Sequence, residues 1–301
     1  MQIAVTGGGG FIGAWIVRKL AEAGHDPVVF DLHSDRSKLA QIAGSAMAER
    51  IRWIAGDICE TDDLVAATRG CQGIVHLAGL LTPACRENPV LGARVNLIGT
   101  VNAFLAAREN GIGHVSYMSS TGVFGPDGGP EPRPTTLYGA YKLGAEHCAR
   151  AFLVEDGITS TGFRPYVVYG PGRDAGLSAG PSLACRAAAR GEAYTIPFTG
   201  PVDLIHAGDV ARIFVADLAQ RKRGAHTVNL LGTAADITEV ATMIRQIIPD
   251  AKITANGPPM PITTPQEEPL LTDLFPDWRP MPLKEGLADT IDYYRVEPVP
   301  R

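Results

Sequence analysis

Residues 3–13 of this chain are Ile3-Ala-Val-Thr-Gly-Gly-Gly-Gly-Phe-Ile-Gly13, and this stretch decides the fold. Its first three residues form the short apolar run expected of a strand buried on both faces of a parallel sheet. After the four glycines, apolar residues between Phe11 and Ala23 recur at helical spacing. A glycine turn between a strand and a helix is the structural context of a phosphate-binding fingerprint.

The glycines fit the approach of a pyrophosphate to the start of the helix. Unpaired backbone N–H groups and the helix dipole favour an anion there. A Cβ at Gly7 or Gly10 would obstruct the turn or the phosphate, and one at Gly13 would push the helix off the strand. The run satisfies both Gly7-x-x-Gly10-x-x-Gly13 and Gly8-x-Gly10-x-x-Gly13, so the spacing leaves the variant open.

A second predicted strand, residues 27–30, ends in Asp31. An acidic residue roughly 20 positions after the glycines is where the ribose 2′-hydroxyl of a dinucleotide would be held. This favours a dinucleotide site over a flexible glycine loop without a ligand.

The composition limits the classes of function. The chain has 301 residues, 45% hydrophobic and 20% charged, with a net charge of −5 and no basic block. We therefore expect a soluble globular protein that does not bind nucleic acid. The five cysteines have no metal-like spacing, so we expect no metal and reduced thiols in the cytoplasm. The early first strand leaves no room for a signal peptide, and no apolar run looks long enough to span a membrane.

Strands and helices alternate along the first half of the chain. Further strands are predicted at residues 51–56, 73–77, 114–118 and 159–164, and helices at 88–110 and 137–155, with a polar connection after Asp31. Such repeated units predict an α/β fold with a Rossmann-type doubly wound parallel sheet.

The character of the sequence changes after Tyr169, where glycines and prolines mark a loop. We predict an NAD-binding domain over residues 1–169 and a smaller α/β substrate-binding lobe over 170–301. A helix at 210–220 and part of 226–231 return to the first domain. The other elements expected in the lobe are helices at 183–190, 237–248 and 283–294 and strands at 203–205 and 253–255.

Three places in the first domain are candidates for cofactor contact. Asp57-Ile58 follows the third strand and either meets the adenine or caps a helix. The small residues Ala78 and Gly79 fit a chain that passes close beneath the cofactor. Asn96 within the long helix either serves the site or is hydrogen-bonded for structure.

Tyr138-Gly-Ala-Tyr-Lys142 is the candidate catalytic motif. A Tyr and a Lys four residues apart on a helix face the same way, and a nearby ammonium lowers the pKa of a phenol. A general acid/base needs such a pKa. Ser120, at the carboxyl end of the fifth strand, would hold the substrate oxygen beside Tyr138. Tyr141 directly precedes Lys142 and so points away from it.

Together these motifs resemble the extended short-chain dehydrogenase/reductases, the group of nucleotide-sugar epimerases, dehydratases and reductases. The resemblance covers nearly the whole chain in the family's motif order. The motifs are Thr6-Gly-Gly-Gly-Gly-Phe-Ile-Gly13, Val95-Asn-Leu-Ile-Gly-Thr100, the strand end at Ser120, Tyr138-x-x-x-Lys142, Arg164-Pro-Tyr-Val-Val-Tyr-Gly-Pro-Gly172, Asp203-Leu-Ile-His-Ala-Gly-Asp209-Val-Ala and Glu285-Gly-Leu-Ala-Asp-Thr-Ile-Asp-Tyr-Tyr294.

The resemblance implies roles for these residues. Tyr138 would take the proton of a substrate hydroxyl while the carbon gives a hydride to NAD, Lys142 would bind the nicotinamide ribose, and Ser120 would position the reacting oxygen. It also implies a homodimer through helices 88–110 and 137–155. The implied cofactor residues are Gly7, Gly10, Phe11, Ile12, Gly13, Asp31, Asp57, Ile58, Leu77, Ala78, Gly79, Asn96, Ser119, Tyr138, Lys142, Pro165 and Val168.

Asp31 favours NAD, because a carboxylate would repel the 2′-phosphate of NADP. His33 and Arg36 keep NADP as the second alternative.

The chain departs from the family where the substrate is concerned. Nucleotide-sugar members often have an Asn at the place of Val167 and an Arg at the place of Val202, which bind phosphates. Two valines argue against a nucleotide sugar, unless Arg164, Arg173 or Arg186 compensates. The expected substrate residues are Ser120, Thr121, Arg173 and His206, although Arg173 alternatively is solvated and His206 alternatively only packs. Thr121-Gly122 offers no carboxylate for a dehydratase.

Three functions remain open from the sequence. The first is an NAD-dependent dehydrogenase that oxidises a secondary hydroxyl of a small sugar, sugar acid or similar polyhydroxylated substrate. The alternative is an NAD-retaining sugar or nucleotide-sugar epimerase, which would use Ser120, Tyr138 and Lys142 in the same way. The third is a non-catalytic NAD-binding module, which would have no need of the intact catalytic set.

Overall fold

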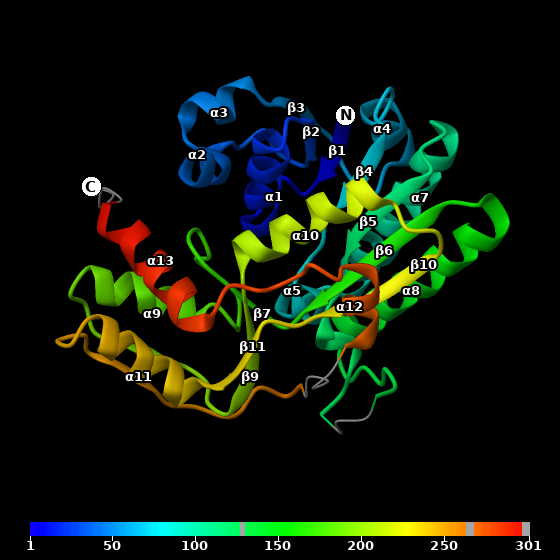
Figure 1. Cartoon of the computed structure of the whole chain (residues 1–301). Helices are drawn as coiled ribbons and strands as arrows, with labels where there is room; N and C mark the ends of the chain where they lie inside the picture. Colours follow the sequence, from blue (N-terminus) through cyan, green and yellow to red (C-terminus); the bar gives the residue numbers. More distant parts are fainter. Residues whose placement is uncertain (127–129, 263–267, 297–301) are drawn as a thin grey trace.

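The computed structural model describes residues 1–126, 130–262 and 268–296 (Figure 1). Its centre is a seven-stranded sheet in the order β10-β6-β5-β4-β1-β2-β3, in which every neighbouring pair is parallel. The strands are β1 (Gln2–Thr6), β2 (Asp26–Asp31), β3 (Arg52–Ala55), β4 (Gly73–His76), β5 (His114–Met118), β6 (Thr159–Pro165) and β10 (Ala225–Leu230). The predicted doubly wound parallel sheet is confirmed.

The chain reverses direction across the sheet between β1 and β4. Val5 of β1 pairs with Val29 of β2 on one side and with Val75 of β4 on the other, and all three are fully buried. Ligands of such sheets bind outside the carboxyl ends of the strands at this switch point. The glycine turn follows β1 directly, so it lies there.

Two layers of helices cover the sheet. One core lies under α1 (Phe11–Glu22), α2 (Ser37–Ala43) and α10 (Ala207–Gln220). The other lies under α4 (Thr61–Ala67), α7 (Gly99–Glu109) and α8 (Leu137–Asp156). The polar connection expected after Asp31 instead contains α2 and α3 (Ser45–Arg50). Leu39 and Ile42 of α2 join the core, which explains why this short segment is helical.

The helix expected at residues 88–110 consists of three pieces. They are α6 (Pro89–Ala93), a π-helical turn η1 (Arg94–Ile98) and α7. By length and composition alone, residues 89–109 together could cross a membrane. The prediction that no apolar run is long enough to span a membrane is therefore corrected for this segment. Half of its most apolar 18-residue window is buried inside the protein.

The second half of the chain builds a lobe with its own core. The lobe contains a three-stranded sheet in the order β11-β9-β7 and the two-stranded pair β12-β8. Its elements are β7 (Val167–Tyr169), α9 (Gly180–Ala189), β8 (Tyr194–Ile196), β9 (Pro201–His206), β11 (Thr233–Asp236), α11 (Ile237–Ile247), β12 (Ile253–Ala255) and α13 (Leu283–Val296). The short α12 (Pro269–Leu274) instead packs on the main core.

Two elements of the second half pack with the first half of the chain. β10 forms its edge beside β6, and α10 packs against α1 (Figure 1). This interleaving brings the lobe against the carboxyl ends of the strands.

Candidate active site

The glycine turn forms a cradle of backbone groups at the start of α1. Gly7 has φ +72°, and a Cβ there would lie 2.7 Å from the backbone nitrogen of Ala78. A Cβ on Gly13 would lie 2.2 Å from the carbonyl oxygen of Gly7. Gly10 is the N-cap of α1, and no side chain caps the helix. Because Gly7 is the glycine with left-handed backbone, the structure favours the Gly7-x-x-Gly10-x-x-Gly13 register.

A groove runs from this cradle past the ends of β2 and β3. Asp31 is held at its edge, where Oδ2 accepts a hydrogen bond of 2.9 Å from the Gly9 N–H. The predicted cofactor residues that line the groove are Gly7, Gly10, Asp31, Asp57, Ile58, Leu77, Ala78 and Gly79. A backbone cradle that a Cβ would fill, followed by an acidic strand end, fits an NAD-type dinucleotide.

Asp57 does not cap α4, because the N-cap of that helix is Glu60. Its Oδ1 instead accepts a 2.9 Å hydrogen bond from the backbone N–H of Cys59. Of the two alternatives for Asp57, the structure favours contact with the groove.

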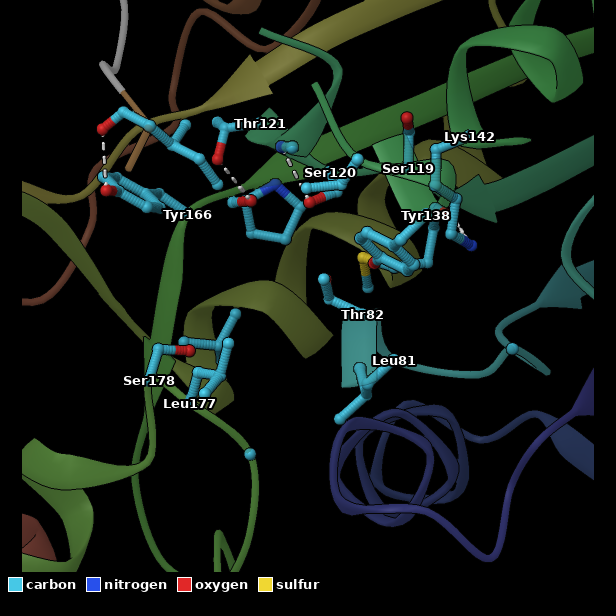
Figure 2. Close-up of a pocket in the computed structure, with 18 of the residues that line it drawn as sticks. Leu81, Thr82, Ser119, Ser120, Thr121, Tyr138, Lys142, Tyr166, Leu177 and Ser178 are labelled. Carbon is cyan, nitrogen blue, oxygen red and sulfur yellow. Dashed lines mark hydrogen bonds between the residues drawn. The ribbon is translucent and has the colours of Figure 1, made fainter. Parts of the chain in front are cut away.

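A cavity of about 260 Å³ continues from the groove to the lobe. The predicted residues Ile12, Asn96, Ser119, Ser120, Thr121, Tyr138, Lys142, Pro165, Val168 and Arg173 line it. Figure 2 shows Ser120, Tyr138 and Lys142 on one wall, with Leu177 and Ser178 of the lobe across from them. Gly13 and Phe11 do not line either space. Gly13 is buried in the first turn of α1, and the Phe11 ring lies under the Arg173 guanidinium.

Tyr138 reaches this cavity because Thr136 caps α8, accepting a 3.1 Å hydrogen bond from the Gly139 N–H. Burial raises the pKa of Tyr138, and a hydrogen bond from Ser120 and the Arg173 charge oppose that rise. The Ser120 hydroxyl also accepts a 3.0 Å hydrogen bond from the Gly122 N–H. Ser120 is therefore fixed at the end of β5 beside the phenol.

Lys142 does not lower the pKa of Tyr138 as expected. Its Nζ donates a 2.8 Å hydrogen bond to the carbonyl oxygen of Met118 and lies 5.9 Å from the centre of the Tyr138 ring. Burial of the ammonium lowers the pKa of Lys142 to about 8. The spacing of four residues brings both side chains to the cavity, but burial is the largest influence on the pKa of Tyr138, and Lys142 is not among the groups that shift it.

Tyr141 points away from Lys142, as its position in the helix predicts. Its hydroxyl donates a 3.0 Å hydrogen bond to the carbonyl oxygen of Pro89.

Asn96 combines features of both alternatives for its role. Its Nδ2 donates to the carbonyl oxygens of Leu80 at 3.2 Å and Gly92 at 3.1 Å. Its Oδ1 is buried and has no hydrogen-bond partner among the described residues. The residue sits in the π-helical turn η1, a conformation that often marks functional positions.

The rest of the cavity wall was not predicted from the sequence. It comes mainly from residues 80–83 at the start of α5 (Thr82–Glu87), from residues 135–136 and 176–178, from Tyr166 and from residues 260–262. The Tyr166 hydroxyl donates a 2.8 Å hydrogen bond to the Ile262 carbonyl and so fixes that segment over the cavity. The apolar residues of this remaining part of the wall are Leu80, Leu81, Pro83, Met118, Phe124, Leu177, Met260, Pro261 and Ile262.

His206 does not line the cavity, contrary to its prediction as a substrate residue. Its Nδ1 accepts a 3.2 Å hydrogen bond from the Gly208 N–H and caps α10. The ring packs edge-on against Trp15 and Tyr169. The packing alternative therefore describes His206 in this structure.

Val167 and Val202 also lie outside the cavity. Both are buried in the core of the lobe, while Tyr166 and Val168 on either side of Val167 face the cavity. The argument from these valines against a nucleotide sugar therefore rests on positions that do not touch the cavity in this structure.

Of the three arginines considered as phosphate ligands, two are paired. Arg164 forms an ion pair with Glu146, with its Nε 2.7 Å from Oε1. Arg186 lies 3.2 Å from Asp174. Arg173 alone of the three lines the cavity.

Among the described residues, no group of three or more His, Cys, Asp or Glu side chains is placed to hold a metal ion. The cavity wall contains no Asp or Glu among those residues, so it offers no carboxylate for elimination chemistry.

The glycine cradle and the Ser120, Tyr138 and Lys142 set define an NAD-dependent oxidoreductase. The chain belongs to the NAD dependent epimerase/dehydratase family, whose sequence profile matches residues 3–230. The resemblance to the extended short-chain dehydrogenase/reductases is thereby confirmed.

Three known proteins illustrate this membership. UDP-glucose 4-epimerase from Corynebacterium glutamicum is 26% identical over 270 residues, which cover 82% of this chain and 80% of that protein. dTDP-L-rhamnose 4-epimerase from Burkholderia thailandensis is 28% identical over 295 residues, covering 81% and 80%. The structure of MoeE5 in complex with UDP-glucose and NAD has a TM-score of 0.81 and 28% identity, covering 98% of this chain and 99% of that one.

Proposed function

We propose that this enzyme is an NAD-retaining sugar epimerase, which oxidises a secondary hydroxyl and returns the hydride to the opposite face of the same carbon. The observation that carries the proposal is its similarity to sugar-nucleotide 4-epimerases along about four-fifths of both chains. The alternative hypothesis from the sequence thus becomes the first.

The residues of the cavity support this chemistry. Tyr138 accepts the proton of the substrate hydroxyl and gives it back to the same oxygen, and the Ser120 hydroxyl holds that oxygen beside the phenol. Lys142 binds the nicotinamide ribose next to Tyr138. Bound NAD supplies the hydride acceptor. The wall facing Tyr138 is mostly apolar, and its charged residues are Lys142 and Arg173.

The second candidate is a dehydrogenase that releases the oxidised product and exchanges NAD at each turnover. It would act on a small free sugar or sugar acid. The observation that favours it is the scarcity of cations: Lys142 and Arg173 are the charged residues of the described cavity wall, and a diphosphate is usually bound by more than one free cation.

NAD rather than NADP is part of the proposal. Asp31 stands at the edge of the groove, and its carboxylate would repel a 2′-phosphate.

A substrate panel separates the two candidates. Purified enzyme is incubated with free sugars, sugar acids and nucleotide hexoses, with NAD, with NADP and without added cofactor. Product is followed by chromatography and the reduced cofactor by its near-ultraviolet absorbance. An epimerase gives the epimer without net reduced cofactor, using NAD that copurifies. Stoichiometric reduced NAD would instead establish the dehydrogenase, and silence on the whole panel would favour the non-catalytic module.

A further inference from the structure

We infer that the substrate carries a carboxylate and that Arg173 binds it close to the carbon whose hydroxyl faces Tyr138. The inference deepens the proposed function, on which it rests, by naming the chemical class of the substrate as a sugar acid. It applies to both an epimerase and a dehydrogenase.

The hydrogen-bonding capacity of Arg173 is only partly used. Its Nη2 donates a 2.9 Å hydrogen bond to the Ser178 hydroxyl, and its guanidinium lies 5.5 Å from the centre of the Phe11 ring. Its Nε is buried and has no partner among the described residues. A buried N–H without an acceptor is costly, so this donor calls for an acceptor that the protein itself does not provide.

The charge balance of the cavity points to an anion. Lys142 and Arg173 are both cationic, and the described wall contains no Asp or Glu. The carboxylate next in sequence, Asp174, is paired with Lys38 and Arg186. Burial lowers the pKa of Arg173 to about 10, as expected of a guanidinium without a counter-ion.

The position of Arg173 favours a substrate group over the cofactor pyrophosphate. Arg173 lines the cavity of Ser120 and Tyr138, whereas the glycine groove is lined by other residues. Arg173 offers a single guanidinium, hydrogen-bonded to the Ser178 hydroxyl, in a cavity whose wall includes the apolar side chains of Leu177 and Met260. A guanidinium matches one carboxylate in a two-pronged hydrogen bond.

The loop that carries Arg173 is fixed on both sides before any ligand binds. The Gly172 N–H donates a 2.9 Å hydrogen bond to the Tyr294 hydroxyl, and Trp15 Nε1 donates one of 3.0 Å to the Pro171 carbonyl. Asp174 ties the loop to α2 through Lys38 and to α9 through Arg186. The guanidinium is therefore preorganised, which lowers the entropic cost of binding.

Matched pairs of ligands test the inference. The pairs are galacturonate with galactose, glucuronate with glucose, and UDP-glucuronate with UDP-glucose. For each, kcat/KM is measured, and binding to the NAD-saturated enzyme is measured by calorimetry. The variants are Arg173→Gln, Arg173→Lys and, as a control, Arg186→Gln, which removes an arginine of the same loop cluster outside the cavity.

We expect the wild-type enzyme to prefer the acid of at least one pair by roughly 10- to 100-fold, the effect of a hydrogen-bonded charge pair. Arg173→Gln should abolish that preference, with the affinity for NAD unchanged. Because the Arg173 charge also lowers the pKa of Tyr138, the acid and the neutral sugar should share any loss of kcat. Arg173→Lys should keep part of the preference. Arg186→Gln removes one of the two ion pairs of Asp174 and should keep most of it.

Two results would overturn the inference. One is a wild-type enzyme that prefers no acid over its neutral partner in turnover or binding. The other is an Arg173→Gln variant that weakens NAD binding as much as acid binding, which would assign Arg173 to the pyrophosphate. If the enzyme binds acids through Arg173 but converts none, the proposed function fails and the inference stands.

Discussion

At the scale of single residues, two tyrosines three positions apart on α8 have different environments. Tyr138 faces the cavity beside Ser120, whereas the Tyr141 hydroxyl is used by the Pro89 carbonyl. Helix α8 thus carries one tyrosine hydroxyl inside the candidate site and one outside it.

This pair gives a matched test of catalysis. We expect Tyr138→Phe to lower kcat by roughly 10²- to 10⁴-fold, the usual contribution of a general acid/base. Its affinity for NAD, measured by calorimetry, should stay near the wild-type value. Tyr141→Phe should lose only one hydrogen bond and keep most of the activity. Equal losses in the two variants would show that the phenol of Tyr138 has no special role.

At the scale of elements, strand β9 of the lobe carries a buried carboxylate. Asp203 is 6% exposed, and its Oδ1 accepts a 2.8 Å hydrogen bond from the Gly232 N–H. Burial raises its pKa to about 6, against the opposing effect of that hydrogen bond. The folded protein therefore keeps Asp203 protonated to a higher pH than the unfolded chain does.

The sign of the resulting pH effect follows from linkage. Below the pKa of the unfolded chain, Asp203 is neutral in both the folded and the unfolded state, so its ionisation does not affect the free energy of unfolding. As the pH rises to about 6, the carboxylate ionises more readily in the unfolded chain, and this destabilises the fold by at most about 3 kcal/mol. We expect Asp203→Asn to have a Tm advantage over the wild type that grows between pH 4 and pH 6.5 and then levels off.

Thermal unfolding of both proteins across this pH range measures the difference. Asp250→Asn, a change at an exposed carboxylate, should track the wild type throughout. A Tm difference for Asp203→Asn that does not change with pH would contradict the raised pKa.

At the scale of the whole molecule, two packed helical segments present apolar side chains to solvent. Val90 is 72% exposed and Val154 78% exposed. The other exposed apolar residues on these segments, which comprise α6, η1 and α8, are Leu91, Ile98 and Leu137. Apolar side chains gathered on neighbouring helices suit an interface between two copies of the chain.

We expect a homodimer through residues 88–110 and 137–155, and we expect Ile98→Glu and Val154→Glu to shift it toward monomer. A charge buried in an apolar interface is destabilising because it has no partner there. Light scattering after size exclusion measures the mass. Val296→Glu, at an exposed site on α13, is the control. A wild-type monomer, or a dimer that both charges leave intact, would exclude this interface.

The sequence by itself determined the sheet, the glycine turn and the helix that carries Tyr138 and Lys142, because each depends on local patterns. Buried parallel strands need continuous apolar runs, the turn needs glycine at Gly7 and Gly13, and a helix of known phase places Tyr138 and Lys142 four residues apart. These constraints act within a few residues, so they are visible in the chain without its partners.

Only the tertiary structure decided the environment of each side chain. It turned His206 into a helix cap, placed Val167 in the lobe core, directed Lys142 to the Met118 carbonyl and paired Arg164 with Glu146. It also left Arg173 with an unused donor in the cavity. The physical reason is that burial and ion pairing depend on residues from distant segments, and their spacing in the sequence carries no record of which ones meet.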